Sequence, residues 1–408
     1  MTPIRNVVQQ GLERGIPAIQ AVVLHRGDPV VDLAVGEHDG GTVAPTTRFD
    51  AASLTKLVAT TAVVAVLRSQ RVFDLDDPVA DALPSFAANG KAQVTVRQLL
   101  AHASGLPAWR PFFVAAMADP VGSAIYPWSE THGAVARALA FDRSRQLVLD
   151  SALRLPLEQP GVRTYSDVGF IALGEWLTAV TGEPLDALCQ RLVFEPCAAH
   201  RTGFFDLRSA PFSVDPLVAT GASRPRPPAP GQEDAFTVRP HASGHDLGCV
   251  DDDNAYAMAG VAGHAGVFST ATDIAAIAQV LLDDFYGAGH IADADVLREF
   301  FAPDASAAGA SRGLGVDRIS PSGSTAGSRF GQAGPLGGVG HLGFTGCSLW
   351  IDLDRRAVAA LLTNRVLPGR EQTEAIRWLR PAFHDAAAAR IDGGPAIDEP
   401  TDPGSPRM

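Results

Sequence analysis

The distribution of apolar residues predicts β-strands near both ends of the chain. Residues 18–39, AIQAVVLHRGDPVVDLAVGEHD, form two β-rich runs separated by RGDP, a pattern typical of a hairpin. Residues 347–365, CSLWIDLDRRAVAALLTNR, repeat this pattern around DLDRR. Helices are expected beside these hairpins, because residues 4–14 are amphipathic and residues 370–391 have a helical pattern, bent or broken at Pro381.

The middle of the chain has a helical pattern. Residues 54–68 are apolar on nearly all sides of a helix, which indicates a buried helix. A short capped helix is expected in VTVRQLL at 94–100, and several more helices between 130 and 200. Residues 206–248 are Pro-rich, and residues 302–340 are rich in Gly, Ser and Ala around a short strand in GLGVDRI.

This order of elements predicts an α/β (α+β) fold in which an antiparallel sheet, built from both ends of the chain, is flanked by helices and interrupted by an inserted, mainly helical region. A cleft is expected where the two regions meet. The predicted parts are a sheet domain of residues 1–75 and 250–390, a helical domain of residues 76–249 that includes the Pro-rich loop 206–248, and a disordered tail of residues 392–408.

Composition narrows the class of protein. The 408 residues are 46% hydrophobic and 19% charged, as in globular proteins that fold in water. A net charge of −12 argues against nucleic acid as a partner. No membrane span is predicted, because the sequence contains no run of about 18 apolar residues without a charge. The first residues lack the pattern of an export signal, so a cytoplasmic location is expected, with the four cysteines reduced.

Lysine is rare in this chain, since only Lys56 and Lys91 occur among 33 basic residues. Ser53 and Lys56 are three residues apart, and such residues share one face of a helix. A buried lysine can act as a base because burial lowers its pKa, whereas arginine stays protonated. Ser53 and Lys56 are therefore a candidate nucleophile and base. The alternative is that Ser53 simply caps the helix.

Two distant segments supply candidate partners. Tyr165 and Asp167 flank Ser166 just before a predicted helix, where Asp167 could instead be an N-cap and Tyr165 a packing residue. His341 and Gly343 lie in GHLGFTG, and a glycine there would let a substrate approach a strand closely. The alternative is a Gly-rich turn with an incidental histidine.

Together, in this order, the three segments resemble the serine hydrolases of the β-lactamase-related superfamily, which includes class C β-lactamases, penicillin-binding carboxypeptidases and esterases. VRQLLAHASGLP, YSDVGFIALGEWLTAVTGEPLDAL and NAYAMAGVAGHAGVFSTATDIA resemble further family segments, and the likeness covers most of residues 15–385. It is closest to the branch of penicillin-binding-protein-4B-like carboxypeptidases and esterases, which has Tyr-Ser-Asp and His-x-Gly-Phe-Thr-Gly.

The resemblance implies a role for each motif residue. Ser53 would be the acylated nucleophile and Lys56 its base, while Tyr165 would pass a proton to the leaving group or water. The backbone N–H groups of Ser53 and Phe344 would form the oxyanion hole. Further substrate-site positions would be Asp167, where the β-lactamases have Asn, His341, where they have Lys, and Gly343.

These departures favour an esterase or amidase acting on a small-molecule ester or amide. A cleft that has Asp167 and lacks the third-motif lysine should hold an anionic β-lactam poorly. Carboxypeptidase or β-lactamase activity, a biosynthetic acyltransferase and a catalytically silent binding protein stay as alternatives. Asp251 stands where the related branch often has His, and the oligomeric state is not predicted.

Neither a metal nor another cofactor is predicted. His241, His245 and Asp246 lie among Gly, Ser and Pro, where helical spacing has no meaning. DDDN at 251–254 lacks the Gly and Glu positions of a calcium loop, and GVAGHAG at 260–266 has no nucleotide-binding pattern. His102 and His264 are interpreted as structural.

Overall fold

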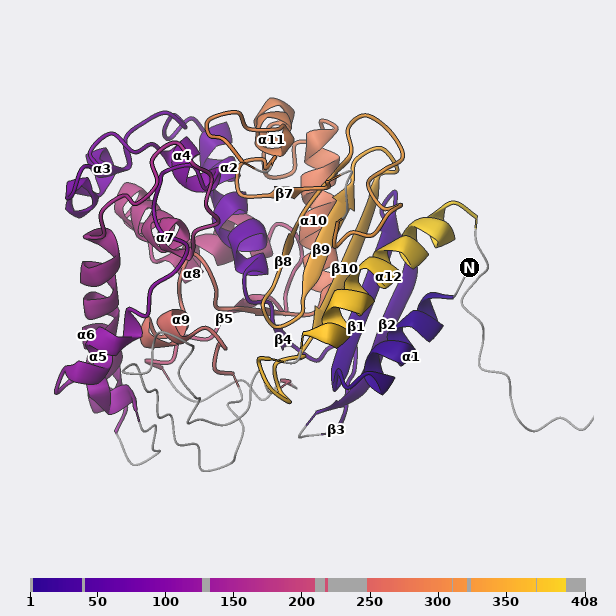
Figure 1. The fold of residues 1–408 in the computed structure, drawn as a ribbon, viewed down its shortest axis with the longest axis horizontal. Coiled ribbons are helices and arrows are strands. Elements are labelled where there is room, and N and C mark those ends of the chain that lie inside the picture. The colour runs from indigo at the N-terminus through magenta and orange to yellow at the C-terminus, as the bar shows by residue number, and fades with distance from the viewer. Residues whose placement is uncertain are drawn as a thin grey trace, which may run out of the picture.

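The structure is a computed structural model that describes residues 3–38, 41–126, 133–209, 217–218, 248–309, 311–320, 324–371 and 373–393. Its centre is a seven-stranded antiparallel sheet with the order β3-β2-β1-β10-β9-β8-β7 (Figure 1). The strands are β1 (Ala18–His25), β2 (Asp28–His38), β3 (Gly41–Thr42), β7 (Asp317–Arg318), β8 (Gly338–Leu342), β9 (Ser348–Asp352) and β10 (Ala357–Thr363).

Both predicted hairpins are present, and they meet at the middle of the sheet. The turn between β1 and β2 places Arg26 and Gly27 at φ values of 55° and 86°, as a tight hairpin requires. β1 then pairs with β10, with Val22 opposite Ala360. The two ends of the chain thus form one sheet, which confirms the predicted α/β fold class.

Helices cover both faces of this sheet. Helices α1 (Ile4–Glu13) and α12 (Glu374–Ile391) pack together on one face, beside alternate residues of β1 and β10 (Figure 1). Helix α10 (Ala271–Phe285) covers the other face. Helix α12 runs without interruption through Pro381, so the break considered there does not occur.

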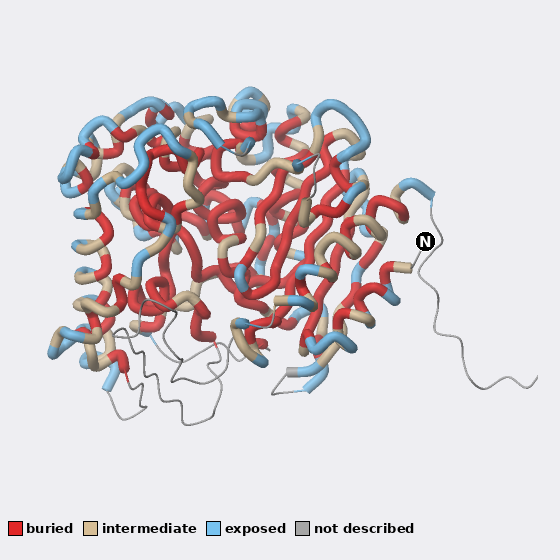
Figure 2. Tube along the Cα trace, in the orientation of Figure 1, coloured by how far each residue is buried: buried red, intermediate tan, exposed pale blue. Residues whose placement is uncertain are grey.

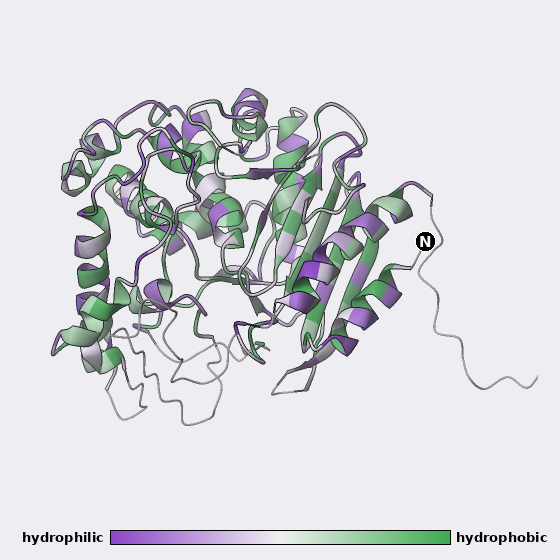
Figure 3. Cartoon of the chain, in the orientation of Figure 1, coloured by the Kyte–Doolittle hydropathy of each residue, from purple (hydrophilic) through white to green (hydrophobic). Residues whose placement is uncertain are grey.

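The predicted buried helix lies between the sheet and the helical region. It consists of a π-helical segment, η1 (Lys56–Thr61), followed by α2 (Ala62–Ser69), and all of its residues from 56 to 67 are buried (Figure 2). The hydropathy colouring shows apolar residues along this helix and the central strands (Figure 3). Around it lie α3 (Val79–Ala82), α4 (Val96–Leu100), α5 (Phe113–Ala118), α6 (Ala134–Leu153), α7 (Asp167–Thr181), α8 (Leu185–Cys189), α9 (Asp253–Ala257) and α11 (Ala294–Phe301), with the shorter turns η2 (Pro84–Ala87), η3 (Gly122–Ile125) and η4 (Gln190–Phe194).

A second, small sheet leads into the candidate site. Strand β6 (Val267–Ser269) pairs with both β4 (Phe49–Asp50) and β5 (Gly203–Phe204). Because β4 is held by this pairing, the position of the chain just before Ser53 is fixed. Most of the Pro-rich loop 206–248 and residues 394–408 of the expected tail lie outside the described residues.

Candidate active site

Ser53 stands on a constrained turn between β4 and η1. The preceding residue, Ala52, has φ +48°, a left-handed conformation that is uncommon for a residue with a Cβ. Its N–H donates to Oδ1 of the buried Asp50 at 2.8 Å, which holds the turn. The N–H of Lys56 bonds to the Ser53 carbonyl at 3.1 Å, and the π-helical turn starts there, as at many functional sites.

The structure brings Ser53 and Lys56 together as the spacing predicts. Lys56 is completely buried, and its Nζ lies 2.9 Å from Ser53 Oγ. The same ammonium contacts the His264 carbonyl oxygen at 2.9 Å and Asp167 Oδ1 at 2.7 Å. Ser53 therefore shares its lysine with a carboxylate from a different helix.

The charge state of Lys56 differs from the prediction. Burial alone lowers its pKa, but the Asp167 carboxylate, followed by the Tyr165 phenol, outweighs burial, so the pKa lies above the ordinary 10.5. The expectation that burial lowers the pKa of Lys56 is wrong for this resting geometry, because a carboxylate 2.7 Å away stabilises the ammonium form.

Tyr165 and Asp167 are held at the start of α7 by Ser166. Ser166, rather than Asp167, is the N-cap, since its hydroxyl accepts the N–H of Gly169 at 3.1 Å. The Ser166 N–H donates to Nδ1 of the buried His102 at 3.0 Å, consistent with the structural interpretation of this histidine. This arrangement leaves the Asp167 side chain available for Lys56.

The Tyr165 phenol belongs to the same group of side chains. Lys56 Nζ lies 5.1 Å from the centre of its ring, and both Lys56 and Ser53 are close enough to the phenol to lower its pKa. Burial raises its pKa above 10, although the neighbouring ammonium acts in the opposite direction. Tyr165 is therefore a neutral phenol that can exchange a proton with either neighbour.

His341 lies near the end of β8, beside Tyr165. The centres of their rings are 5.8 Å apart. Burial is the main cause that lowers the pKa of His341 to about 4, so the imidazole is neutral at pH 7. Its Nδ1 lies 2.8 Å from the Leu342 carbonyl and donates to it, so the lone pair is on Nε2, which is buried and has no hydrogen-bond partner among the described residues.

Gly343 lies where the surrounding backbone leaves no room for a side chain. A Cβ at this position would lie 2.7 Å from the Ala51 carbonyl oxygen and 3.4 Å from the Ala52 Cβ. The glycine therefore lets the turn after β8 pack directly against the chain that precedes Ser53. The side chain of the next residue, Phe344, is 52% exposed, and its ring contacts the Arg365 guanidinium.

One cationic residue near Tyr165 was not predicted from the sequence. The Arg312 guanidinium lies 5.2 Å from the centre of the Tyr165 ring and pairs with Asp317 on β7. Arg312 is one of many arginines in the chain, and it lies in a Gly- and Ser-rich stretch where no motif distinguishes it. The His264 carbonyl was also missed, because a backbone acceptor leaves no trace in residue type.

The remaining candidates have structural contacts. Lys91 is as buried as Lys56, but it donates to the carbonyls of Ala88 and Leu155 and contacts no carboxylate in the described part of the chain. Asp252 caps α9 and lies 2.9 Å from His264 Nε2. Within the described residues, no group of three His, Cys, Asp or Glu side chains is placed to bind a metal, whereas His241, His245 and Asp246 lie outside them.

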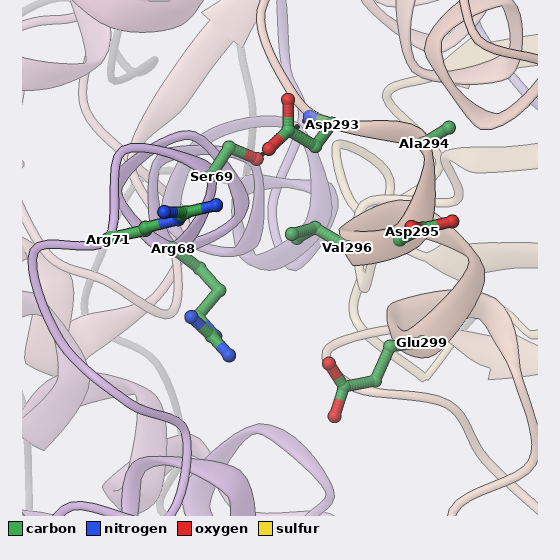
Figure 4. A pocket seen from close by; sticks show the side chains of 8 residues that line it. All are labelled: Arg68, Ser69, Arg71, Asp293, Ala294, Asp295, Val296 and Glu299. Atoms are coloured by element: carbon green, nitrogen blue, oxygen red, sulfur yellow. Dashed lines mark hydrogen bonds between the residues drawn. The ribbon is translucent and has the colours of Figure 1, made fainter.

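A surface cavity of about 480 Å³ lies elsewhere, between the end of α2 and the start of α11 (Figure 4). About 16 residues separate its Ser69 from Ser53 along the helix, which corresponds to roughly 24 Å at about 1.5 Å per residue. Its charged side chains include Arg68 and Glu299, which are paired with Asp74 and Arg97 respectively. We assign no role in the chemistry of Ser53 to this cavity.

The geometry described above, a serine paired with a buried lysine, can be compared with known proteins. The Beta-lactamase family model matches residues 4–382, so the chain belongs to the β-lactamase family. A protein of Escherichia coli K12 named "Putative D-alanyl-D-alanine carboxypeptidase" is 30% identical over 379 residues, which are 88% of this chain and 80% of that protein. This membership makes the protein a serine hydrolase and confirms the resemblance.

Solved structures share the fold at low sequence identity. EstCE1, described as a hydrolase with promiscuous acyltransferase activity, superimposes with a TM-score of 0.64 at 20% identity, covering 93% of this chain and 97% of its own. The octameric penicillin-binding protein homologue of Pyrococcus abyssi gives a TM-score of 0.65 at 17% identity, covering 96% and 77%. These two structures support the fold and leave the substrate open.

The search for membrane-spanning helices is negative across the described ranges. None of the helices there combines the length and apolar character needed to cross a bilayer.

Proposed function

We propose that this protein hydrolyses an ester or amide through an acyl-enzyme formed on Ser53. The observation that carries the proposal is the position of the Lys56 ammonium, 2.9 Å from Ser53 Oγ and 2.7 Å from Asp167 Oδ1. A serine hydroxyl becomes a nucleophile only when a base removes its proton, and Lys56 is the nitrogen base in contact with it. Lys56 must therefore lose one proton before it can accept the serine proton.

The proton then has a short route to the leaving group. Neutral Lys56 takes the proton of Ser53 as Oγ bonds to the carbonyl carbon. Tyr165, which interacts with both residues, gives its proton to the departing oxygen or nitrogen as the C–O or C–N bond breaks, and is reprotonated by Lys56. Water then attacks the acyl-enzyme by the same route in reverse and restores free Ser53.

The negative charge that develops on the carbonyl oxygen is assigned to the backbone N–H groups of Ser53 and Phe344. The close packing of Gly343 on Ala51 supports this assignment, because it brings the turn that carries Phe344 against the chain that carries Ser53. Loss of one such donor typically costs about 10²–10³ in rate.

Small uncharged esters and amides are the substrates that we favour. Asp167 places a carboxylate beside Lys56, and His341, with its pKa lowered to about 4, supplies no charge at pH 7. An anionic β-lactam would therefore meet a carboxylate without meeting a third-motif lysine. A reducing compartment such as the cytoplasm fits the four cysteines, which are all buried and free of disulfides.

A D-alanyl-D-alanine carboxypeptidase is the second candidate. The observation in its favour is Arg312, whose guanidinium lies 5.2 Å from the Tyr165 ring and could face a substrate carboxylate. The name of the relative from Escherichia coli points the same way. The pairing of Arg312 with Asp317 offsets part of this charge, which is why we place esters first.

The proposal is tested by comparing the wild type with Ser53→Ala. We expect the wild type to turn over a p-nitrophenyl ester and to be labelled by a fluorophosphonate, and the variant to do neither. Labelling of the variant would overturn the assignment of Ser53. Added amines or alcohols, with product analysis, separate hydrolysis from acyl transfer, and a wild type that no activated ester acylates would be a silent binding protein.

A further inference from the structure

Arg380 on α12 reaches the turn that carries Phe344. Its Nη2 lies 2.6 Å from the Gly343 carbonyl oxygen and 2.8 Å from the Cys347 carbonyl oxygen, and it donates to both. The N–H of Gly343 also donates to Cys347 O at 2.7 Å. One guanidinium from the C-terminal helix thus joins the two ends of the turn at residues 343–347.

The Gly343 carbonyl and the Phe344 N–H belong to one planar peptide group. A donor on the carbonyl oxygen withdraws electron density from the nitrogen, so the N–H becomes a stronger donor, and hydrogen bonds in such a chain reinforce one another by about 10–30%. The same bond fixes the plane of the peptide and therefore the direction of the N–H. Arg380 thus acts on the Phe344 donor although it lies behind it.

The charge of Arg380 has no carboxylate partner anywhere in the described ranges. Among the residues that the structure describes, its acceptors are the two turn carbonyls, and its Nε is excluded from solvent and has no hydrogen-bond partner. Burial is the main cause that lowers its pKa to about 10, so the guanidinium is still charged at neutral pH. Holding a partly buried charge without a carboxylate partner costs free energy, and a neutral donor would suffice merely to join two carbonyls.

A second arginine contacts the same turn from another strand end. Arg365 Nε donates to the Phe344 carbonyl oxygen at 2.9 Å. On the opposite side, the Thr345 hydroxyl donates to the Asp50 carbonyl oxygen at 2.8 Å, which ties the turn to the chain before Ser53. The turn is therefore fixed relative to the nucleophile, and Arg380 is the cation bonded to the peptide that contains the Phe344 N–H.

We propose that Arg380 is a positioning residue of the oxyanion hole: through the Gly343 carbonyl it orients and polarises the Phe344 N–H that receives the developing negative charge. This inference rests on the proposed function, since it needs Ser53 to form an acyl-enzyme. It adds a partly buried cation of the C-terminal helix to the machinery without giving it contact with the substrate.

The experiment compares Arg380→Gln, which removes the charge, and Arg380→Lys, which keeps it, with Arg377→Gln as the control. Arg377 is exposed on the same helix. Stopped-flow acylation by p-nitrophenyl acetate gives the rate and the apparent KM. Phenylboronic acid, which forms a tetrahedral adduct with the serine oxygen, gives an inhibition constant that depends on the oxyanion hole. Near-UV circular dichroism checks the fold.

We expect acylation to slow by about 10-fold or more in Arg380→Gln, below the 10²–10³ of a lost donor because the N–H itself remains. Phenylboronic acid should bind more weakly by a similar factor, while KM changes less than about threefold. Arg380→Lys should lie between Gln and wild type, and Arg377→Gln should match the wild type.

Acylation and boronic-acid affinity within twofold of wild type in a folded Arg380→Gln would overturn the inference. So would equal losses in the Lys and Gln variants, or a rise in KM that accounts for the whole effect, since either result indicates a structural role. If Arg380→Gln does not fold, the same comparison is made with Arg380→Lys alone. Its acylation rate and its affinity for phenylboronic acid should then both fall relative to wild type, and values of both within twofold of wild type would overturn the inference. Labelling of Ser53→Ala would instead refute the proposed function itself.

Discussion

Replacing Asp167 by Asn tests how the charge of Lys56 controls the reaction. In the structure the ammonium and the carboxylate are 2.7 Å apart, and Lys56 is completely buried. Asn has nearly the same shape but carries no charge. The variant therefore removes the cause that raises the pKa of Lys56 and leaves burial, which lowers it.

The size of the effect follows from the distance. Two opposite unit charges 2.7 Å apart interact by about 6 kcal/mol at an effective dielectric constant of about 20. Solvent reaches 19% of the Asp167 side chain and weakens this interaction. A change of only about 1.4 kcal/mol moves a titration midpoint by one pH unit, so a shift of at least about one unit is expected.

The sign is fixed by the role of Lys56 as the base. Activity needs neutral Lys56, so kcat/KM rises with pH through its titration, and Asp167 moves this rise to higher pH. In Asp167→Asn the rise should move to lower pH. The assay is the pH dependence of kcat/KM for a p-nitrophenyl ester between pH 5 and 10, where the wild type should still be rising at the upper limit because the pKa of Lys56 lies above 10.5. Asp295→Asn is the control because Asp295 is 95% exposed.

Two results would refute this reasoning. An unchanged or more alkaline profile would show that Asp167 does not hold the proton on Lys56. Loss of activity at every pH, in a variant that keeps the wild-type circular dichroism spectrum, would show that the carboxylate itself takes the serine proton.

Three further predictions concern packing, burial and substrate. Gly343→Ala places a Cβ 2.7 Å from the Ala51 carbonyl oxygen and should lower the free energy of unfolding, measured by urea titration, by about 1–3 kcal/mol. Gly203→Ala has open space around the added Cβ and should not lower it, so equal effects of the two substitutions would contradict the packing argument. Burial lowers the pKa of His384 to about 3, so the unfolding free energy of the wild type should fall between pH 6.5 and pH 4 by about 2–3 kcal/mol more than that of His384→Gln. Parallel curves of unfolding free energy against pH for the two proteins would be inconsistent with a buried neutral imidazole. Arg312→Gln should leave p-nitrophenyl ester hydrolysis within about twofold of wild type, and any release of D-Ala from a D-Ala-D-Ala peptide should fall at least about 10-fold; equal changes with both substrates would argue against a carboxylate subsite at Arg312.

Local pattern was enough to predict the sheet and the helices around it. The two hairpins and the buried helix each have a periodicity that a single segment displays. The three motifs were also predictable, since their residue types and order are specific, and the structure brings Ser53, Lys56, Tyr165, Asp167 and His341 together. The catalytic roles of these residues stay predictions.

What the sequence did not reveal depends on contacts between distant segments. Burial of Lys56 could be predicted from the apolar helix, but the raised pKa results from the position of Asp167, 111 places along the chain, which single-segment patterns do not fix. Arg312 and Arg380 are two of many arginines, and only the folded chain shows which carbonyl or ring each one faces. The need for Gly at 343 likewise depends on a backbone oxygen of another segment.

The most direct test of the central claim is the intact mass of the protein quenched during turnover, followed by peptide mapping. A panel of small esters, benzylpenicillin and D-Ala-D-Ala peptides covers the candidate substrates. We predict a mass increase equal to the acyl group, located on the peptide that contains Ser53, fastest with small esters and absent in Ser53→Ala. An adduct on another residue would contradict the acyl-serine account, and fast acylation by benzylpenicillin without acylation by small esters would contradict the substrate order.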